Sequence, residues 1–173
     1  MTEDMGYPYW MSIIIGIDPG SRTTGYGVIR YINHKVEHIA HGCINTKSDT
    51  LADKLNEIFL GITDVIKNHS PLQAAIEQVF TSYNHQSALK LGQARGAALV
   101  ALSHAGLPVD EYSAKQVKRA VVGYGGADKA QVQHMIRALL KLTQTPPPDA
   151  ADALAIAICH CHSQSLLRKI AEQ

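Results

Sequence analysis

The sequence predicts an α/β fold in which a mixed five-stranded sheet carries helices on both faces. Three extended runs follow one another within residues 13–44 with no helical pattern between them, which is typical of consecutive antiparallel strands. From residue 51 onward, segments with helical periodicity alternate with short apolar runs, and this alternation indicates parallel strands joined by helices. The predicted order is βββαβαβααα, with the three antiparallel strands first.

The first three strands are defined by their apolar content and by one turn. Residues 13–17 (IIIGI) form an apolar run typical of a buried strand. Residues 25–32 (GYGVIRYI) and 35–44 (KVEHIAHGCI) follow, joined by a turn at Asn33 and His34. Apolar and polar residues alternate only loosely in the third run, so its inward face is not fixed by the pattern.

Helices and short strands share the rest of the chain. The residues SDT (48–50) offer caps for a helix in which apolar residues recur from Leu51 at offsets of 4, 7, 8, 11, 14 and 15, and that spacing is strongly amphipathic. Further elements are a strand at 72–80, a helix at 84–105, a strand at 107–112, a helix at 113–123, a helix at 129–142 and a last helix after the prolines at 146–148. In the helix at 84–105, Gly92 and Gly96 lie on one face, which permits close approach of another element or subunit.

Length and composition indicate one globular domain. The chain has 173 residues, of which 46% are hydrophobic and 18% are charged. No apolar run is long enough to span a bilayer, and the acidic start MTEDMGYPYW lacks the basic segment of a signal peptide. Three cysteines suit a reducing compartment. We therefore expect a cytoplasmic protein with a single domain at 12–165, an N-terminal appendage at 1–11 and a C-terminal tail at 166–173.

Basic residues are concentrated in one part of an otherwise balanced chain. Between Lys90 and Lys141 there are eight Lys and Arg against three Asp and Glu, although the whole chain carries a net charge of only +1. A solvated helix face would explain such a segment, but the local excess also suits a phosphate-binding surface. The candidates for DNA contact in this segment are Lys90, Arg95, Lys115, Lys118, Arg119 and Lys129.

Two acids stand at the ends of predicted buried strands. Asp18 closes the first strand and is followed by Pro19 and Gly20, so turn formation and ligand binding are equally open interpretations of IIIGIDPG. Glu77 lies toward the end of the strand AAIEQVF. If these strands are parallel neighbours, both carboxylates emerge at the carboxyl edge of the sheet, where ligands of open α/β sheets bind.

Two further acids begin the last helix. Asp149 and Asp152 are three residues apart and can share a helix face. Taken alone, they suit an N-cap and a first-turn acid. Together with Asp18 and Glu77, they form a set of four carboxylates in apolar segments, and buried carboxylates require pairing or a metal ion. Oxygen-only ligands favour Mg²⁺, with Mn²⁺ as a substitute, and two such ions would suit hydrolysis of a phosphodiester.

Five motifs support a family resemblance. They are IIGIDPGSRTTGYGVI, AAIEQVF, SALKLGQARGAAL, QVKRAVVGYGGADKAQVQHM and PPPDAADALAIAICHCH. In this order they resemble the bacterial RuvC-type Holliday-junction resolvases (crossover junction endodeoxyribonucleases), and the likeness spans residues 12–162. The ten residues before Met11 and the loop TSYNHQ (81–86) lie outside the family pattern.

The resemblance implies a fold, an activity and partners. The fold would be RNase H-like, and the protein a homodimer that binds four-way DNA junctions in recombination and repair. It would nick two strands of like polarity with Mg²⁺ and work with the RuvA and RuvB branch-migration proteins. The acidic quartet of the family falls on Asp18, Glu77, Asp149 and Asp152; its functional lysines fall on Lys118 and Lys129, and its base-stacking aromatic falls on Phe80.

Two alternative functions remain open on the sequence. The opening IGIDPG is similar to that of ATP-binding proteins of the sugar-kinase and actin type, but these need a second domain and an adenosine site for which 173 residues leave no room. A non-catalytic junction-binding protein would not need the four acids. The tract CHCH (159–162) has the wrong spacing for a zinc site on a helix, so core and surface roles are expected there.

Overall fold

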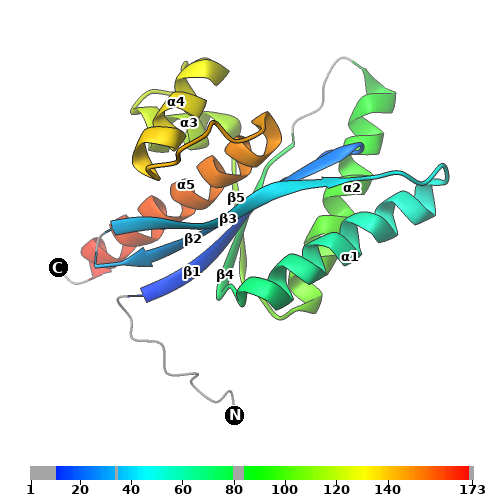
Figure 1. Cartoon of the computed structure of the whole chain (residues 1–173), viewed down its shortest axis with the longest axis horizontal. Coiled ribbons are helices and arrows are strands. Elements are labelled where there is room, and N and C mark those ends of the chain that lie inside the picture. The colour runs from blue at the N-terminus through cyan, green and yellow to red at the C-terminus, as the bar shows by residue number, and fades with distance from the viewer. Residues whose placement is uncertain (1–10, 34, 80–83, 172–173) are drawn as a thin grey trace, which may run out of the picture.

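A five-stranded mixed sheet forms the centre of the molecule (Figure 1). The structure, a computed structural model, describes residues 11–33, 35–79 and 84–171, with side chains as far as Ser165. The strands are β1 (Met11–Asp18), β2 (Thr23–Ile32), β3 (Lys35–Asn45), β4 (Gln73–Glu77) and β5 (Val109–Tyr112), in the order β3-β2-β1-β4-β5. β2 runs antiparallel to β1 and β3, whereas β4 runs parallel to β1 and β5. The predicted mixed sheet is confirmed.

Helices cover both faces of this sheet, as predicted. They are α1 (Leu51–His69), α2 (His85–His104), α3 (Ala114–Val122), α4 (Lys129–Leu139) and α5 (Pro148–Ala171). α1 and α2 pack together on one face, and α5 crosses the other face next to α3 and α4 (Figure 1). Ile15 packs in the hydrophobic core on the α1–α2 face of the sheet, and Ile14 packs in the core on the α5 face. The continuous apolar run of β1 therefore contributes to a hydrophobic core on each face. No helix in the described part of the chain is long and apolar enough to cross a membrane.

Glycines allow α5 to lie directly on the sheet. A Cβ atom at Gly25 would lie 2.0 Å from the carbonyl oxygen of Asp149, and one at Gly16 would lie 2.2 Å from that of Ala153. Both separations are far below van der Waals contact, so these positions admit only glycine at this helix–sheet distance. Because Gly25 pairs with Asp18 in the β1–β2 ladder, the start of α5 is held beside the end of β1.

A β-bulge explains the loose alternation in β3. Ala40 lies opposite Val28, but the next pair joins His38 to Ile29, which leaves Ile39 as the extra residue. The bulge moves His38 and His41 onto the same face, and their Nε2 and Nδ1 atoms lie 2.8 Å apart. A regular strand would have placed residues three apart on opposite faces.

Several element ends differ from the prediction. The strand expected at 72–80 ends at Glu77, so it is shorter than predicted. The helix expected to reach residue 142 ends at Leu139, because Lys141 adopts a φ of 52° and the chain turns. β1 begins at Met11, and α5 continues to Ala171 through most of the segment expected to be a tail.

Candidate catalytic and nucleic-acid site

Four carboxylates from three elements line one cleft. Asp18 is the last residue of β1, Glu77 is the last residue of β4, and Asp149 and Asp152 lie in the first two turns of α5. The cleft has a volume of about 260 Å³. Its other lining residues are Ala114, Val117, Lys118, Lys129, Val132 and Ile156. The sequence predicted this acidic set, and the structure brings all four members together.

The sheet register brings the first pair of acids together. Ile17 of β1 lies beside Ile76 of β4 in the parallel ladder, so the next residues, Asp18 and Glu77, leave adjacent strands at the same edge. Arg95 of α2 fixes this edge further: its Nε donates a hydrogen bond to the carbonyl oxygen of Glu77 at 3.0 Å, and its guanidinium pairs with Glu111. The end of β4 is therefore held by a side chain that the sequence analysis assigned to DNA contact.

The second pair of acids belongs to α5. The sequence left open that Asp149 is the N-cap of this helix; instead, α5 begins at Pro148 and Asp149 lies within its first turn. The close approach at Gly25 brings the backbone of Asp149 onto β2. Both acids therefore enter the cleft from the face of the sheet that α5 covers.

Crowding of the acids changes their protonation. Burial raises the pKa of Asp18 to about 8, with a further contribution from Glu77. Asp152 and Asp149 act in the same direction, and Lys129 opposes them. Burial also raises the pKa of Glu77 and of Asp152. Asp18 is therefore the acid whose protonated form the cleft favours most, and its side chain is hydrogen-bonded to that of Glu77.

The donor set fits a hard divalent cation. All four acids present oxygen atoms, and a dication would favour the carboxylate form of Asp18, which burial and the neighbouring acids disfavour. Within the described residues, no three Asp, Glu, His or Cys side chains lie close enough together to hold a metal ion as they stand. Mg²⁺ keeps several of its waters in protein sites and therefore needs only one or two direct carboxylate ligands.

Two lysines face the acids from the opposite wall. Lys129 Nζ lies 3.5 Å from Asp152 Oδ2, and Lys118 is close enough to lower the pKa of Glu77. Lys118 comes from α3 and Lys129 from the first turn of α4, and each helix begins with a complete capping box. The Lys129 side chain is 77% exposed, against 29% for Asp152, so its charge also reaches solvent. Both lysines lie where the sequence analysis expected functional cations.

The other predicted contact residues lie outside the cleft. Lys115 and Arg119 are exposed on α3, and Lys90 is exposed on α2. Phe80 lies outside the described residues. The positioning contact of Arg95 could not be predicted from the sequence, because its partners are 16 and 18 residues away and no local pattern indicates them.

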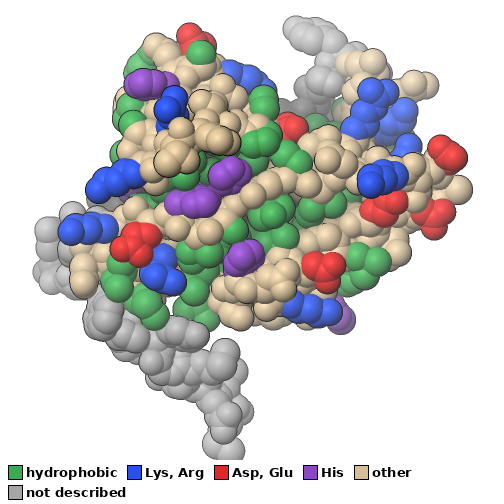
Figure 2. Space-filling view, viewed as in Figure 1, with side chains coloured by type: hydrophobic (Ala, Val, Ile, Leu, Met, Phe, Trp, Pro, Cys, Tyr) green, Lys and Arg blue, Asp and Glu red, His purple; other side chains and the backbone are tan. Residues whose placement is uncertain are grey.

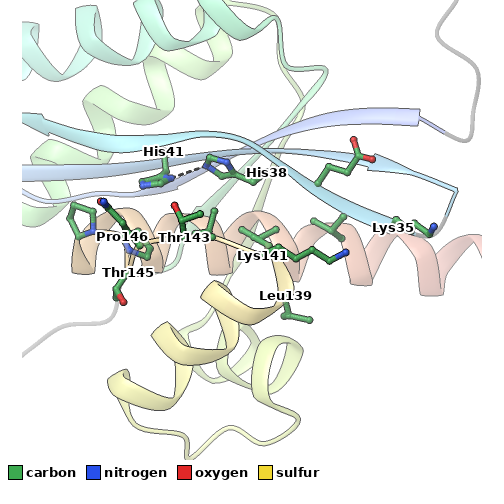
Figure 3. Close-up of a pocket in the computed structure, with 14 residues that line it drawn as sticks. Lys35, His38, His41, Leu139, Lys141, Thr143, Thr145 and Pro146 are labelled. Atoms are coloured by element: carbon green, nitrogen blue, oxygen red, sulfur yellow. Dashed lines mark hydrogen bonds between the residues drawn. The ribbon is translucent and has the colours of Figure 1, made fainter.

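A larger cavity lies elsewhere and carries no acidic cluster. It has a volume of about 1020 Å³ between β3 and the connection from α4 to α5 (Figure 3). His38 and His41 face it, together with Lys35, Lys141 and Thr143. The smaller acidic cleft remains the candidate site, because among the described residues only there do four carboxylates, two lysines and the strongly raised pKa of Asp18 coincide.

The CHCH tract serves the core rather than a metal site. Cys159, His160 and Cys161 are buried, whereas His162 is exposed. His160 Nδ1 lies 3.0 Å from the hydroxyl of Tyr112, and its Nε2 lies 3.0 Å from Gln73 Oε1. These contacts tie α5 to β4 and β5, as the expected core role requires.

Comparison with known proteins gives close relatives. The family model described as Crossover junction endodeoxyribonuclease RuvC matches residues 14–160, a range that includes all four acids. A Coxiella burnetii protein of that name is 61% identical over 160 residues, which are 92% of this chain and 93% of the relative. One from Tolumonas auensis is 59% identical over 161 residues, 93% of each chain. Thermus thermophilus RuvC in complex with Holliday junction substrate has a TM-score of 0.83 and 33% identity, covering 90% of this chain and 96% of that one.

Proposed function

This chain belongs to the RuvC family of crossover junction endodeoxyribonucleases, and we propose that it resolves four-way (Holliday) DNA junctions by nicking two strands of like polarity. The observation that carries the proposal is the convergence of Asp18, Glu77, Asp149 and Asp152 in one cleft with two lysines. This arrangement combines the ligands of hard cations with positive groups that can face a phosphate. Hydrolysis at such a site serves DNA recombination and repair.

The four acids would hold Mg²⁺, with Mn²⁺ as a substitute and two ions per site. Such ions activate water and neutralise charge on the phosphodiester during in-line displacement. The chain itself supplies the geometry, because the acids come from strand ends and a buried helix rather than from loops. Asp18 must release its proton when a cation is bound, since its carboxylate is then the favoured form.

The lysines would act on the phosphate. Lys129 lies at the rim of the cleft and balances Asp152, so it can turn toward a phosphate oxygen when DNA enters. Lys118 approaches from α3 and adds positive charge on the same wall. A positive group held near the scissile phosphate stabilises the charge that develops in the transition state.

The DNA would extend over the basic helices beside the cleft. The proposed backbone contacts are Lys90, Lys115, Lys118, Arg119 and Lys129, and Phe80 would stack on bases at the crossover. Arg95 was also assigned to this surface, but its guanidinium already pairs with Glu111, and a direct DNA contact would require that pair to open.

Two copies would act together on one junction. On α2, Leu89 is 64% exposed and Val100 is 60% exposed, and a Cβ atom at Gly92 or Gly96 would meet nothing within 4 Å. This apolar, small-residue face suits a two-fold contact between helices. A two-fold dimer presents two acidic clefts and thereby explains paired nicks. The protein would work in the cytoplasm together with the branch-migration proteins RuvA and RuvB.

The experiment that tests this function uses a labelled four-way junction and a linear duplex of matched sequence, each with Mg²⁺ or with EDTA. Paired nicks that require the junction and Mg²⁺ support the proposal. Binding of the junction without cleavage supports a non-catalytic junction-binding protein, and neither binding nor cleavage supports the ATP-binding alternative.

A further inference from the structure

A second cleft lies on the face of the sheet that α1 and α2 cover. It has a volume of about 610 Å³. Three cations line it: Arg22 from the β1–β2 connection, Lys54 from α1 and Lys90 from α2. Asp49 is the one acid among its lining residues. The cleft is therefore positive, although this half of the chain is not basic overall.

The topology places this cleft at the same edge of the sheet as the acidic site. Arg22 follows the end of β1 by four residues, and α2 follows the end of β4. β3 also ends at this edge, shortly before Asp49. The acidic cleft lies on the α5 face and the cationic cleft on the α1–α2 face, so one edge of the sheet separates them.

The three cations are available to an external anion. Of the ion pairs between described residues, none involves Arg22, Lys54 or Lys90. Arg22 and Lys90 are exposed, and Lys54 is half-buried. Figure 2 shows Lys and Arg side chains gathered over the N-terminal part of α2 and the neighbouring end of the sheet. Cations that converge on a cleft without internal partners concentrate anions there.

The lining of the cleft suits a phosphodiester backbone. A guanidinium and ammonium groups match phosphate oxygens in charge and hydrogen bonding. Leu51, which is 49% exposed, belongs to the same cleft, where it can pack against a sugar. The combination fits a nucleic-acid strand better than a small inorganic anion, which would use only the charged part.

We propose that Arg22 and Lys54, with Lys90, bind backbone phosphates of junction DNA that has passed over the edge of the sheet from the acidic cleft. The inference rests on the proposed resolvase function and adds a contact site on the opposite face. The site reads no bases, because its charged groups recognise phosphate alone. The bound strand therefore bends over the ends of β1 and β4. It runs from the acidic cleft on one face of the sheet to the phosphate-binding cations on the other face.

The test measures junction affinity as a function of salt for the double variant Arg22→Gln/Lys54→Gln. The matched control is Lys35→Gln/Lys67→Gln, which also removes two positive charges, but at the opposite edge of the sheet. Loss of two phosphate contacts predicts roughly tenfold weaker binding at low salt and a slope of log K against log salt that is flatter by about 1.8. The control variant is expected to keep the native slope. Unchanged circular dichroism shows that each variant is folded.

A second arm uses junctions in which single phosphates are replaced by neutral methylphosphonates. At the phosphates that Arg22 and Lys54 contact, replacement by methylphosphonate weakens binding of the junction by the native protein. The same replacement has no further effect on binding by the double variant. Equal salt slopes for the double variant and the control would overturn the inference, while the native protein would still bind and cut junctions. A lowered dimer stability of the double variant with an unchanged salt slope would also overturn it, because the cleft would then face a second copy.

Discussion

Asp18 and Glu77 end neighbouring parallel strands, and a side-chain hydrogen bond joins them. The strand register sets their separation, so the pair is built into the sheet. Charge crowding in the cleft is relieved by a proton in the free protein and by a cation in the proposed active form. Replacement of the proton by a cation would therefore link folding, metal binding and catalysis.

The free protein should lose stability as the pH rises. The pKa of Asp18 is about 8 in the fold, against an ordinary value of 3.8. A raised pKa contributes stability that is fully present below about pH 4 and is lost as the pH rises toward 8. At about 1.4 kcal/mol per pKa unit and about 2–4 °C per kcal/mol, the melting midpoint in EDTA is expected to fall by roughly 10 °C or more over this window. Differential scanning calorimetry measures it.

The control for that prediction is Asp18→Asn, which lacks the titrating group. Its midpoint in EDTA should exceed that of the native protein at pH 8, and its decline from pH 4 to 8 should be smaller. Mg²⁺ should raise the native midpoint most at high pH. Equal pH profiles for the two proteins would show that the acids do not repel one another in the fold.

Buried His160 predicts that the fold also loses stability as the pH falls into the acidic range. Burial lowers the pKa of His160 below its usual 6.5, so the fold favours the neutral ring. Its contribution to stability is present above about pH 6.5 and is lost as the pH falls below that value. We expect His160→Ala to cost about 2–4 kcal/mol at pH 8, because it leaves Tyr112 and Gln73 without their shared partner.

Urea denaturation at pH 8 and at pH 5.5 measures this effect. The difference in stability between the native protein and His160→Ala should shrink at the lower pH, where the native protein loses its advantage. A difference that grows at pH 5.5 would mean that the buried ring is charged in the fold.

Gly25→Ala should lower the cleavage rate, although Gly25 does not line the acidic cleft. The new Cβ atom would lie 2.0 Å from the carbonyl oxygen of Asp149, so the start of α5 must move away from β2. Overpacking of this kind costs about 1–3 kcal/mol, and displacement of catalytic groups lowers rates by about 100-fold. Single-turnover cleavage of a junction measures the rate. Gly126→Ala is the control, since its Cβ atom would meet Tyr124 only at an ordinary 3.8 Å.

Lys129→Gln should lower the cleavage rate without weakening Mg²⁺ binding. Removing the cation 3.5 Å from Asp152 is expected to lower the cleavage rate about 100-fold. It should not weaken Mg²⁺ binding, because the site loses a competing positive charge. Titration calorimetry with Mg²⁺ and cleavage assays on the same samples measure both quantities. Weaker Mg²⁺ binding by Lys129→Gln would contradict the assignment, and Lys141→Gln, at an exposed turn, should change neither.

The exposed face of α2 predicts a dimer. Val100→Glu should place like charges in the contact and raise the dimer dissociation constant by at least about tenfold. Sedimentation velocity measures the change, and paired nicks should become independent single nicks. Leu60→Glu on α1 is a matched control, because Leu60 is 50% exposed on a different helix. Dissociation caused equally by both variants would remove α2 from the interface.

The sequence predicted the acidic site because backbone topology alone brings its members together. Asp18 and Glu77 end apolar strands, and their convergence requires only that the strands be parallel neighbours. The contacts that depend on side-chain packing could not be predicted. Arg95 reaches Glu77 across the α2–sheet interface, and the bulge at Ile39 aligns His38 with His41 through a single unpaired residue.

Cleavage by Asp18→Asn in Mg²⁺ tests the central claim most directly. With a labelled four-way junction under single-turnover conditions, we predict a rate at least about 1,000-fold below that of the native protein, a loss of about 4 kcal/mol in transition-state stabilisation. Junction affinity measured in EDTA should stay within about threefold of the native value, because the substitution leaves the proposed phosphate contacts in place. Native rates of paired nicking by Asp18→Asn would contradict the account, since the acidic cleft would then not be the site of hydrolysis.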